Sequence, residues 1–558
     1  MTMSKFLSVA ILVVLSTVVF ASEPKGTEIV PLREDLSSYH RTVSTKIPEA
    51  QQYFDQGLTL YWGFNHEAAI RSFKRAQEID PKCAMAYWGE AISLGPNINL
   101  PIYLDDEQPK AAFEALQKAR KLAKKASPVE RALIHALEAR YTYPKPEDLM
   151  PLNRAYANAM REVWRAYPED PDVGALFADA MMNLRPWDLW KPNGEPQPGT
   201  PEIMATIERV IEMVPDHPGA CHFYIHTCEA SPFPQLALPA ADRLRNRVPG
   251  AGHLVHMPSH IDVRVGHYEE GNKANQRAIE IDNEWTRGQG GVYAVYRAHN
   301  YHFLAYGAMF LGQQEVANEA ARGIREQIPL EMVRGLPDFL DAFWGVPYHV
   351  MVRFGQWDKI LEEKAPPEDL TATTAFWRYA RTVALASLGR VEEAEKEFAQ
   401  LKLANDAVQE SRLMGNNAVR TALEVGLPLA EGELEYRRGN YDKAFALLDR
   451  AVVRYDSLKY SEPWDWMMPA RHALGALLLE QGRLADAEIV YRDDLKQHPH
   501  NGWALNGLAE VLRLTNRSDE AELVEQQFAD SWKHSDITIK ASCFCRTGDA
   551  PMLKQASR

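Results

Sequence analysis

Long hydrophobic runs are scarce in this sequence, and the single strong one stands at its start. Residues 1–21 carry one lysine before an apolar stretch that ends in Val19, Phe20 and Ala21, a small-residue pattern suited to signal peptidase. We therefore predict a removed export signal and a periplasmic location. No later segment approaches the roughly 20 apolar residues that a membrane span needs, so no membrane span is expected.

Cysteine and positive charge are also in short supply. Five cysteines in 558 residues exclude a disulfide scaffold. A net charge of -14 argues against a nucleic-acid partner, which needs a basic surface. The sequence has no nucleotide-binding glycine loop, nucleophile elbow or HExxH motif, and this absence excludes kinases, serine hydrolases and zincin proteases.

A short glycine-containing turn between two amphipathic segments recurs along the chain. Examples are "RVGHYEEGNKANQRAIEID", "SLGRVEEAEKEFAQL" and "RRGNYDKAFALLDRAV". Near the N-terminus, "LTLYWGFNHEAAIRSFKRAQEIDP" places Ala69, Phe73, Ala76 and Pro81 at the spacing of packing positions followed by a helix-ending proline. The pattern predicts an all-α chain of antiparallel helix pairs.

The turns resemble those of the tetratricopeptide repeat superfamily over most of residues 45–530. The turn glycines Gly266, Gly312, Gly355, Gly389, Gly439 and Gly482 are 46, 43, 34, 50 and 43 residues apart. The ideal repeat is about 34 residues, so we expect extended helices or longer loops. The resemblance, which includes exported bacterial repeat proteins of unsettled activity, implies a right-handed solenoid whose first helices line a concave surface.

We therefore divide the chain into a signal peptide (1–21), an N-terminal extension (22–44), a solenoid (45–530) and a tail (531–558) that carries Cys543 and Cys545. The tail cysteines are expected as a surface disulfide or a thiol pair. A segment rich in proline, glycine and tryptophan, 184–202, is expected to be a long loop that acts as a lid or as a packed connection.

Eight of the 17 histidines recur at matching distances from the turns. Three stand 13, 10 and 6 residues before Gly266, and the same offsets from Gly312 meet two histidines and Tyr306. Spacings of i, i+3 and i+7 lie within about 60° on a helix, and Glu229 joins the stripe of its own segment. The candidate metal ligands, which place a metal centre around residues 217–350, are His222, His226, His253, His256, His260, His299, His302 and His349.

Such a set of imidazoles suits copper or zinc better than metals that prefer carboxylates. Export and Met257 inside the cluster favour copper, and eight ligands are enough for more than one ion. The preferred hypothesis is an exported copper oxidoreductase with its centre on the concave face and Tyr306 as hydrogen-bond donor or redox-active phenol. In the zinc alternative, Glu229 is a ligand or the general base of a hydrolase.

Two non-enzymatic hypotheses stay open beside these. One is a scaffold that binds a peptide or protein partner in its groove, and the other is a periplasmic metal carrier. The substrate of an enzyme at this site, a small molecule or a peptide, is not identified. Cys221 and Cys228 flank the histidines and are expected to pack as small apolar residues in preference to binding Cu(I). His217, His267, His498 and His500, near turns, are expected at the surface.

Overall fold

The computed structural model describes residues 30–36, 39–103, 105–286 and 293–548. The chain forms two compact units: the first comprises Met1–Ile261 and Arg277–Tyr293, the second Asp262–Gln276 and Ala294–Arg558. Residues 45–530, the predicted solenoid, are thus divided between the two units. The predicted export signal lies outside the described residues. Among the helices described, none combines the length and the apolar character that crossing a membrane requires.

The first unit is built from α-helices joined by short connections. These are α2 (Pro48–Trp62), α3 (His66–Ile79), α4 (Ala84–Ser93), α5 (Glu107–Leu122), α6 (Pro128–Glu138), α7 (Met150–Ala166), α8 (Pro171–Met182), α9 (Thr200–Met213), α10 (Pro218–Cys228), α11 (Leu238–Leu244) and α12 (Gly252–His256). Short 3-10 turns η1, η2 and η3 span Glu34–Leu36, Ala123–Lys125 and Pro234–Ala237. Helices α13 (Pro258–Val265) and α14 (Tyr268–Thr286) contribute residues to both units.

The second unit is again helical, with one small hairpin. Its helices are α15 (Tyr293–Leu311), α16 (Gln314–Gln327), α17 (Leu330–Gly335), α18 (Pro337–Leu340), η4 (Ala342–Gly345), α19 (Val346–Arg353), α20 (Trp357–Glu362), α21 (Thr371–Ser387), α22 (Val391–Ala407), α23 (Val419–Arg437), α24 (Tyr441–Asp456), α25 (Ala470–Glu480), α26 (Leu484–Gln497), α27 (Gly502–Leu514) and α28 (Ser518–Trp532). Strands β1 (Leu413–Met414) and β2 (Asn417–Ala418) pair antiparallel.

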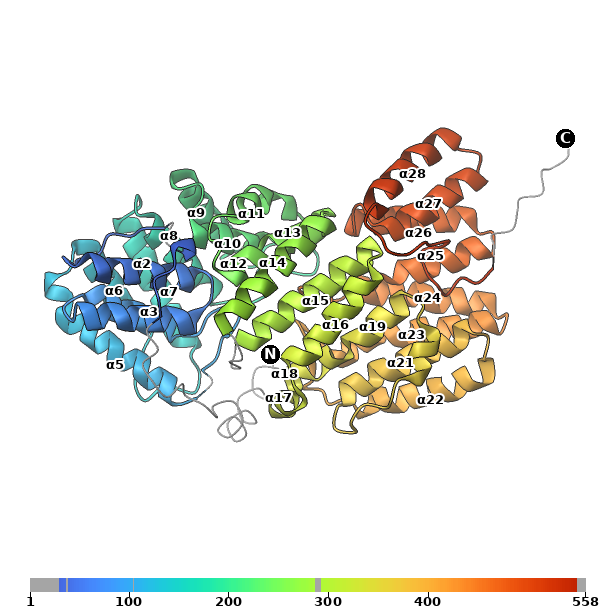
Figure 1. Cartoon of the computed structure of the whole chain (residues 1–558), viewed down its shortest axis with the longest axis horizontal. Helices are drawn as coiled ribbons and strands as arrows, with labels where there is room; N and C mark the ends of the chain where they lie inside the picture. The colour runs from blue at the N-terminus through green and yellow to red at the C-terminus, as the bar shows by residue number, and fades with distance from the viewer. Residues whose placement is uncertain (1–29, 37–38, 104, 287–292, 549–558) are drawn as a thin grey trace. The chain divides into compact units, whose positions relative to one another are not determined.

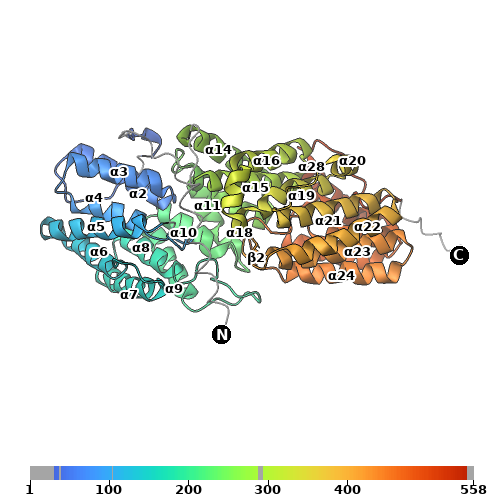
Figure 2. The ribbon, with the colours of Figure 1, turned by 90° about the horizontal axis from the view of Figure 1, so that it is seen from below.

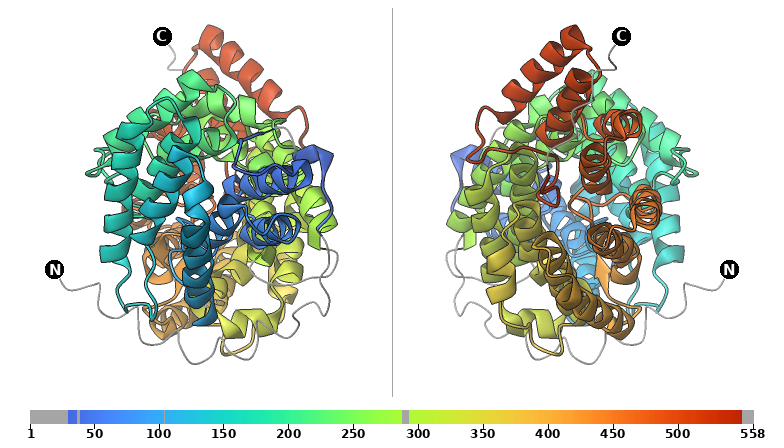
Figure 3. Two further views of the ribbon diagram at one scale, coloured as in Figure 1. Left: turned by 90° about the vertical axis from the view of Figure 1, so that its left-hand side faces the viewer. Right: turned by 90° about the vertical axis from the view of Figure 1, so that its right-hand side faces the viewer.

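The predicted all-α class of antiparallel helix pairs is confirmed. In the second unit α21 to α24 lie side by side as two hairpins (Figures 1 and 2), and the red C-terminal pair α27–α28 forms another (Figure 3). All six predicted turn glycines have positive φ, between 60° and 84°. Two further turns use Phe64 and Asn516 at φ 53° and 60°, so glycine alone does not mark every turn.

Large aromatic side chains fill the space between successive helix pairs because glycines face them. Phe73 of α3 packs against Gly57 of α2 and Gly89 of α4, where an added Cβ would clash with its ring. In the second unit Tyr491 of α26 packs in the same way between Gly475 and Gly507. Each aromatic stands 16 residues from both of its glycines. This repeated large-against-small packing is what stacks neighbouring hairpins.

Candidate metal centre

Helix α10 positions the first part of the centre. It begins at Pro218, with the His217 side chain accepting a hydrogen bond from the Ala220 amide at 3.1 Å. His222 and His226 are four residues apart and so project from one face of the helix. Glu229 follows the last residue of the helix. The three side chains are 0%, 5% and 1% exposed, which makes α10 a buried helix with polar groups pointing inward.

An interruption between two short helices positions the second group of histidines. Helix α12 ends at His256 and α13 begins at Pro258, so Met257 interrupts the helical segment that "HLVHMPSH" suggested. Proline at the first position of α13 has no amide hydrogen to continue α12. His253 and His256 lie before the break and His260 lies after it, all within the first unit and all buried.

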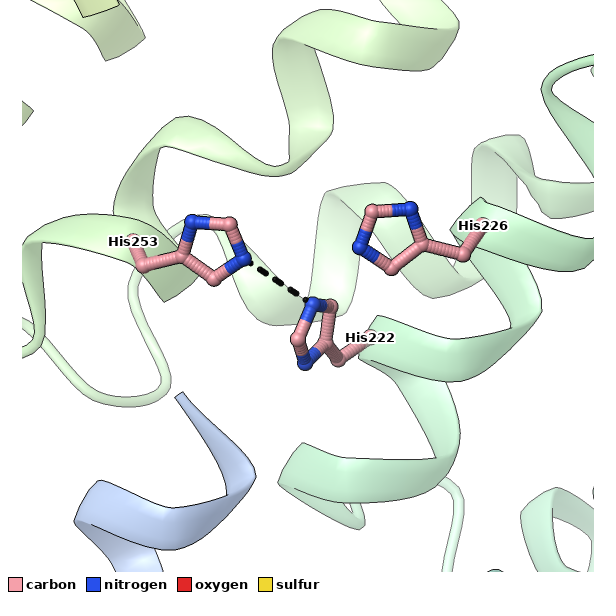
Figure 4. Close-up of side chains that lie close together, drawn as sticks. All are labelled: His222, His226 and His253. Carbon is pink, nitrogen blue, oxygen red and sulfur yellow. Dashed lines mark hydrogen bonds between the residues drawn. The ribbon is translucent and has the colours of Figure 1, made fainter. Parts of the chain in front are cut away.

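Three of these histidines gather around one point. The rings of His222, His226 and His253 face one another (Figure 4), and one nitrogen from each lies within 4.8 Å of the others. His222 Nε2 and His253 Nε2 are 3.2 Å apart. Two imidazole nitrogens bound to one tetrahedral ion at about 2.0–2.1 Å stand roughly 3.3 Å apart. The observed separation therefore matches the geometry of two ligands on one ion.

The Nδ1 atoms of two of these histidines are tied to acceptors. His222 Nδ1 donates to the Trp62 carbonyl at 2.6 Å, and His226 Nδ1 donates to Glu229 Oε1 at 2.7 Å. A carbonyl and an ionised carboxylate can only accept, so the proton of each neutral imidazole is on Nδ1. Each Nε2 is then unprotonated; that of His222 lies 3.2 Å from His253 Nε2, within hydrogen-bond distance. That of His226 is buried and has no hydrogen-bond partner among the described residues.

Glu229 also anchors a second imidazole pair. His260 Nδ1 donates to Glu229 Oε2 at 2.5 Å, and His260 Nε2 lies 2.7 Å from His256 Nε2. The latter distance is too short for two ligands of one ion and fits an N–H···N hydrogen bond with His256 as donor. Ser259 Oγ lies 3.4 Å from His256 Nδ1. In the first unit, His256 and His260 thus lie in a chain of hydrogen bonds that holds Glu229 and, through it, His226.

Burial sets the charge of the cluster. Desolvation lowers the pKa of His222, His226 and His253, and neighbouring imidazoles lower those of His222 and His253 further, well below the usual value. Burial raises the pKa of Glu229, but His260 and His226 outweigh it and hold that pKa well below its usual range. At pH 7 the imidazoles of His222, His226 and His253 are therefore mainly neutral and the Glu229 carboxylate is ionised, the states in which a metal centre and its supporting acceptor work.

Aromatic side chains that the sequence did not place beside the histidines enclose the three imidazoles. Phe64 lies at ring-centroid distances of 4.6 Å from His222 and 5.5 Å from His253. Trp187 meets His226 edge-on at 5.3 Å. In the same loop, Trp190 Nε1 donates to the Thr227 carbonyl at 2.7 Å. The 184–202 segment is therefore a packed connection that covers α10. Phe64 and Trp187 both have positive φ, a strained conformation that no sequence pattern reveals.

The remaining predicted site residues belong to the second unit. His302 and His349 are buried, and desolvation lowers the pKa of each to about 3. His302 packs on Phe343, and His349 packs on Phe376 and Trp466. Tyr306 stacks on Trp464 at 5.8 Å, and burial raises its pKa well above the usual value.

Two cysteines and four histidines outside the predicted ligand set were also assigned from the sequence, and the structure bears out some of these assignments. Cys221 and Cys228 are buried free thiols, and desolvation raises the pKa of each to about 12, which agrees with packing. His217 and His498 are 0% and 1% exposed, so their predicted surface position is wrong, whereas His267 and His500 are exposed as predicted. His217 Nε2 lies 3.3 Å from Asp172 Oδ1, and His498 Nε2 shares a hydrogen bond with the Tyr455 hydroxyl at 3.0 Å. Proximity to a turn does not imply exposure when the turn is packed.

The last of the predicted ligands, His299, lies on α15 with its ring 5.1 Å from that of Phe303.

No protein-family model and no curated protein matches this chain. Solved structures with similarity to it include a human IFIT1 dimer with m7Gppp-AAAA, at 12% identity and a TM-score of 0.33 over 90% of this chain and 96% of the other. A Rap protein complexed with Competence and Sporulation Factor has 14% identity and a TM-score of 0.33 over 73% and 98% of the two chains. Yeast Tom70 has 13% identity and a TM-score of 0.27 over 87% and 92%.

These structures are tetratricopeptide-repeat proteins, the superfamily that the turns of this chain resemble. At TM-scores of 0.33 or lower, these likenesses indicate nothing about what this chain binds.

Proposed function

We propose that this chain is a tetratricopeptide-like scaffold whose first unit binds one transition-metal ion. The ligands are Nε2 of His222, Nε2 of His226 and a ring nitrogen of His253. The observation that carries the proposal is the pair of Nδ1 hydrogen bonds to the Trp62 carbonyl and Glu229, which fix the tautomers. Metal-binding histidines in proteins are generally oriented by such an acceptor on the other nitrogen.

The donor set favours Cu²⁺ or Zn²⁺. Imidazole suits both ions, whereas Mg²⁺, Ca²⁺ and Mn²⁺ prefer oxygen. Both oxygens of Glu229 accept hydrogen bonds from His226 and His260, so we assign the carboxylate to orienting His226 and not to binding the ion. For the same reason Glu229 suits an orienting role better than that of a general base.

Elemental analysis of the purified full chain tests the proposal. After growth with copper, zinc and iron we expect about one equivalent of copper or zinc per chain. His226→Ala removes a ligand without adding bulk, and its metal content should fall below roughly 0.2 equivalents per chain. The control His135→Ala changes an exposed histidine of α6 and should keep the wild-type content. Less than roughly 0.2 equivalents in the folded wild-type chain would refute the proposal.

A second candidate, metal-dependent catalysis at the same ion, is favoured by the number of ligands. Three histidines leave a tetrahedral ion one open position, as in catalytic zinc sites, whereas structural sites use four protein ligands. A copper oxidoreductase and a zinc hydrolase are the two versions. Oxygen consumption by the copper-loaded chain and ester hydrolysis by the zinc-loaded chain separate them, with His226→Ala as the inactive control. A metal-loaded chain with neither activity supports a carrier or a binding scaffold.

A further inference from the structure

The C-terminal tail brings a cysteine pair to a buried carboxyl group in the second unit. Cys543 and Cys545 form a disulfide bond. A carboxylate oxygen of Glu433, on α23, and the two sulfur atoms all lie within 4.8 Å of one another. Glu433 is 4% exposed, Cys545 is 0% exposed and Cys543 is half-buried. The sequence had suggested only a surface disulfide or thiol pair, without a neighbouring acid.

The tail is fastened on both sides of the disulfide. Before it, Ser542 bonds to the Tyr491 hydroxyl at 2.8 Å and donates to the His472 carbonyl at 2.7 Å. After it, the Arg546 guanidinium makes two hydrogen bonds to Glu510, at 2.7 and 2.8 Å. The Arg437 side chain donates to the Cys545 carbonyl. These contacts hold the two sulfurs against α23, so the fold itself places the disulfide beside Glu433.

Stabilisation does not account for this disulfide. A disulfide stabilises mainly by closing a loop in the unfolded chain, and its effect grows with the length of that loop. Here the bonded residues are two positions apart, and the tail already has hydrogen bonds on either side. A structural role also gives no reason to bury a carboxyl group beside the sulfurs, since burying an ionisable group costs free energy.

We propose that Cys543, Cys545 and Glu433 form a thiol–disulfide exchange site that accepts two electrons from a dithiol substrate. Cys543 is the sulfur that is attacked, because it is the more exposed of the two. The Cys545 amide donates to Cys543 Sγ at 3.1 Å, a contact that stabilises a thiolate on Cys543 after reduction. The site shares no residue with the histidine centre, and its test is independent of metal.

The exchange balances in two steps. A substrate thiolate attacks Cys543 Sγ and forms a mixed disulfide, while the bond between the two cysteines breaks and its electron pair leaves with Cys545 Sγ. Glu433 gives its proton to that sulfur and regains one from the substrate's second thiol. The second substrate thiolate then closes the substrate disulfide and releases Cys543. The substrate, which enters with one thiolate and one thiol, loses two electrons and one proton; the cysteine pair gains both electrons, the proton is on Cys545 and Cys543 is left as the thiolate.

Burial supplies the acid that the first step needs. Desolvation raises the pKa of Glu433 to about 7, although Arg437 and a hydrogen bond from Ser387 lower it. Ser387 Oγ donates to Glu433 Oε2 at 3.3 Å. An acid works best when its pKa is near the operating pH, because it is then partly protonated and also gives up its proton readily.

The first experiment measures reduction of the folded full chain by dithiothreitol at pH 7, quenched with an alkylating reagent and read by peptide mass. We expect reversible reduction of Cys543 and Cys545, while the buried thiols Cys83, Cys221 and Cys228 stay unlabelled. Glu433→Gln should slow reduction by about a hundredfold. The control Glu431→Gln alters an acid of the same helix that pairs with Lys443, and should react like the wild type. Equal rates in the wild type and Glu433→Gln would overturn the proposal.

The second experiment assigns the attacked sulfur and does not depend on Glu433. Cys545→Ser leaves Cys543 alone, and Cys543→Ser leaves Cys545 alone. With oxidised glutathione, Cys543 should form the mixed disulfide at least about tenfold faster, because attack requires access to the sulfur. Circular dichroism checks that both variants are folded. Equal or reversed rates in folded variants contradict the assignment, as does a disulfide that resists dithiothreitol in the native wild type.

Discussion

Replacing Glu229 with glutamine tests the metal centre without removing any ligand. The carboxylate accepts from His226 Nδ1 at 2.7 Å and from His260 Nδ1 at 2.5 Å. A glutamine side chain has one oxygen and one NH₂ group, so it can accept from only one of the two. The other histidine faces a donor and must change its tautomer. When that histidine is His226, its proton moves to Nε2, the nitrogen that we assign to the metal.

The magnitude follows from the loss of this supporting acceptor. Mutation of such groups typically lowers metal affinity 10- to 100-fold, which corresponds to about 1.4–2.7 kcal/mol. We expect Glu229→Gln to lower the affinity for Zn²⁺ within this range, and His226→Ala to lower it further. The loss should be larger than for any exposed acid of the first unit, because the Glu229 side chain is 1% exposed.

Competition with a chelator of known affinity measures the effect on the purified full chain. Glu212→Gln is the matched control, because Glu212 lies on α9, is exposed and pairs only with Arg209 at 3.4 Å among the contacts described. Circular dichroism confirms that each variant is folded. If Glu229→Gln binds Zn²⁺ as tightly as Glu212→Gln, the inference that Glu229 fixes the His226 tautomer is wrong.

Three further predictions concern stability and packing. Burial lowers the pKa of His302 and of His349 to about 3, against about 6.5 in the unfolded chain, so the unfolded chain binds more protons below pH 6.5. The free energy of unfolding should therefore fall as the pH drops from about 6.5 towards 3, by up to ~1.4 kcal/mol per pH unit for each group. Urea midpoints measured across this range should show the fall, and His349→Phe should make it shallower. Gly439→Ala should lower the free energy of unfolding by about 1 kcal/mol through the backbone alone, because φ is 79° and no atom lies near the added Cβ. Gly439→Asn should lower it less in the same urea assay, because asparagine tolerates positive φ better than alanine. Equal losses in the two variants would contradict a purely backbone effect. Gly219→Ala should lower the free energy of unfolding by about 1–3 kcal/mol, because the new Cβ would meet the Trp62 ring at 2.5 Å. It should also weaken metal binding, because the Trp62 carbonyl accepts a hydrogen bond from His222. Unchanged affinity in chelator competition would show that the position of Trp62 does not affect the metal centre.

The helical repeats were predictable because their causes are local. A glycine at φ 79° such as Gly439 is needed wherever one helix turns sharply into the next, and the amphipathic pattern on either side gives the helix pair. The turns at Phe64 and Asn516 show the limit, because there a non-glycine residue takes the same conformation for reasons of packing. The 16-residue spacing of Phe73 from Gly57 and Gly89 was also present in the sequence, but only the contacts gave it meaning.

The sequence identified histidines that the first unit brings close together, but it could not assign their roles. The spacing within α10 and around Met257 determined which imidazoles face one way, since helical periodicity is a property of the local chain. Tertiary structure decided that His222 meets the Trp62 carbonyl, 160 residues away, and that Glu229 joins His226 to His260. Whether an imidazole binds an ion or supports another side chain depends on which nitrogen is protonated. Partners far along the chain decide that, as they do for the disulfide beside Glu433.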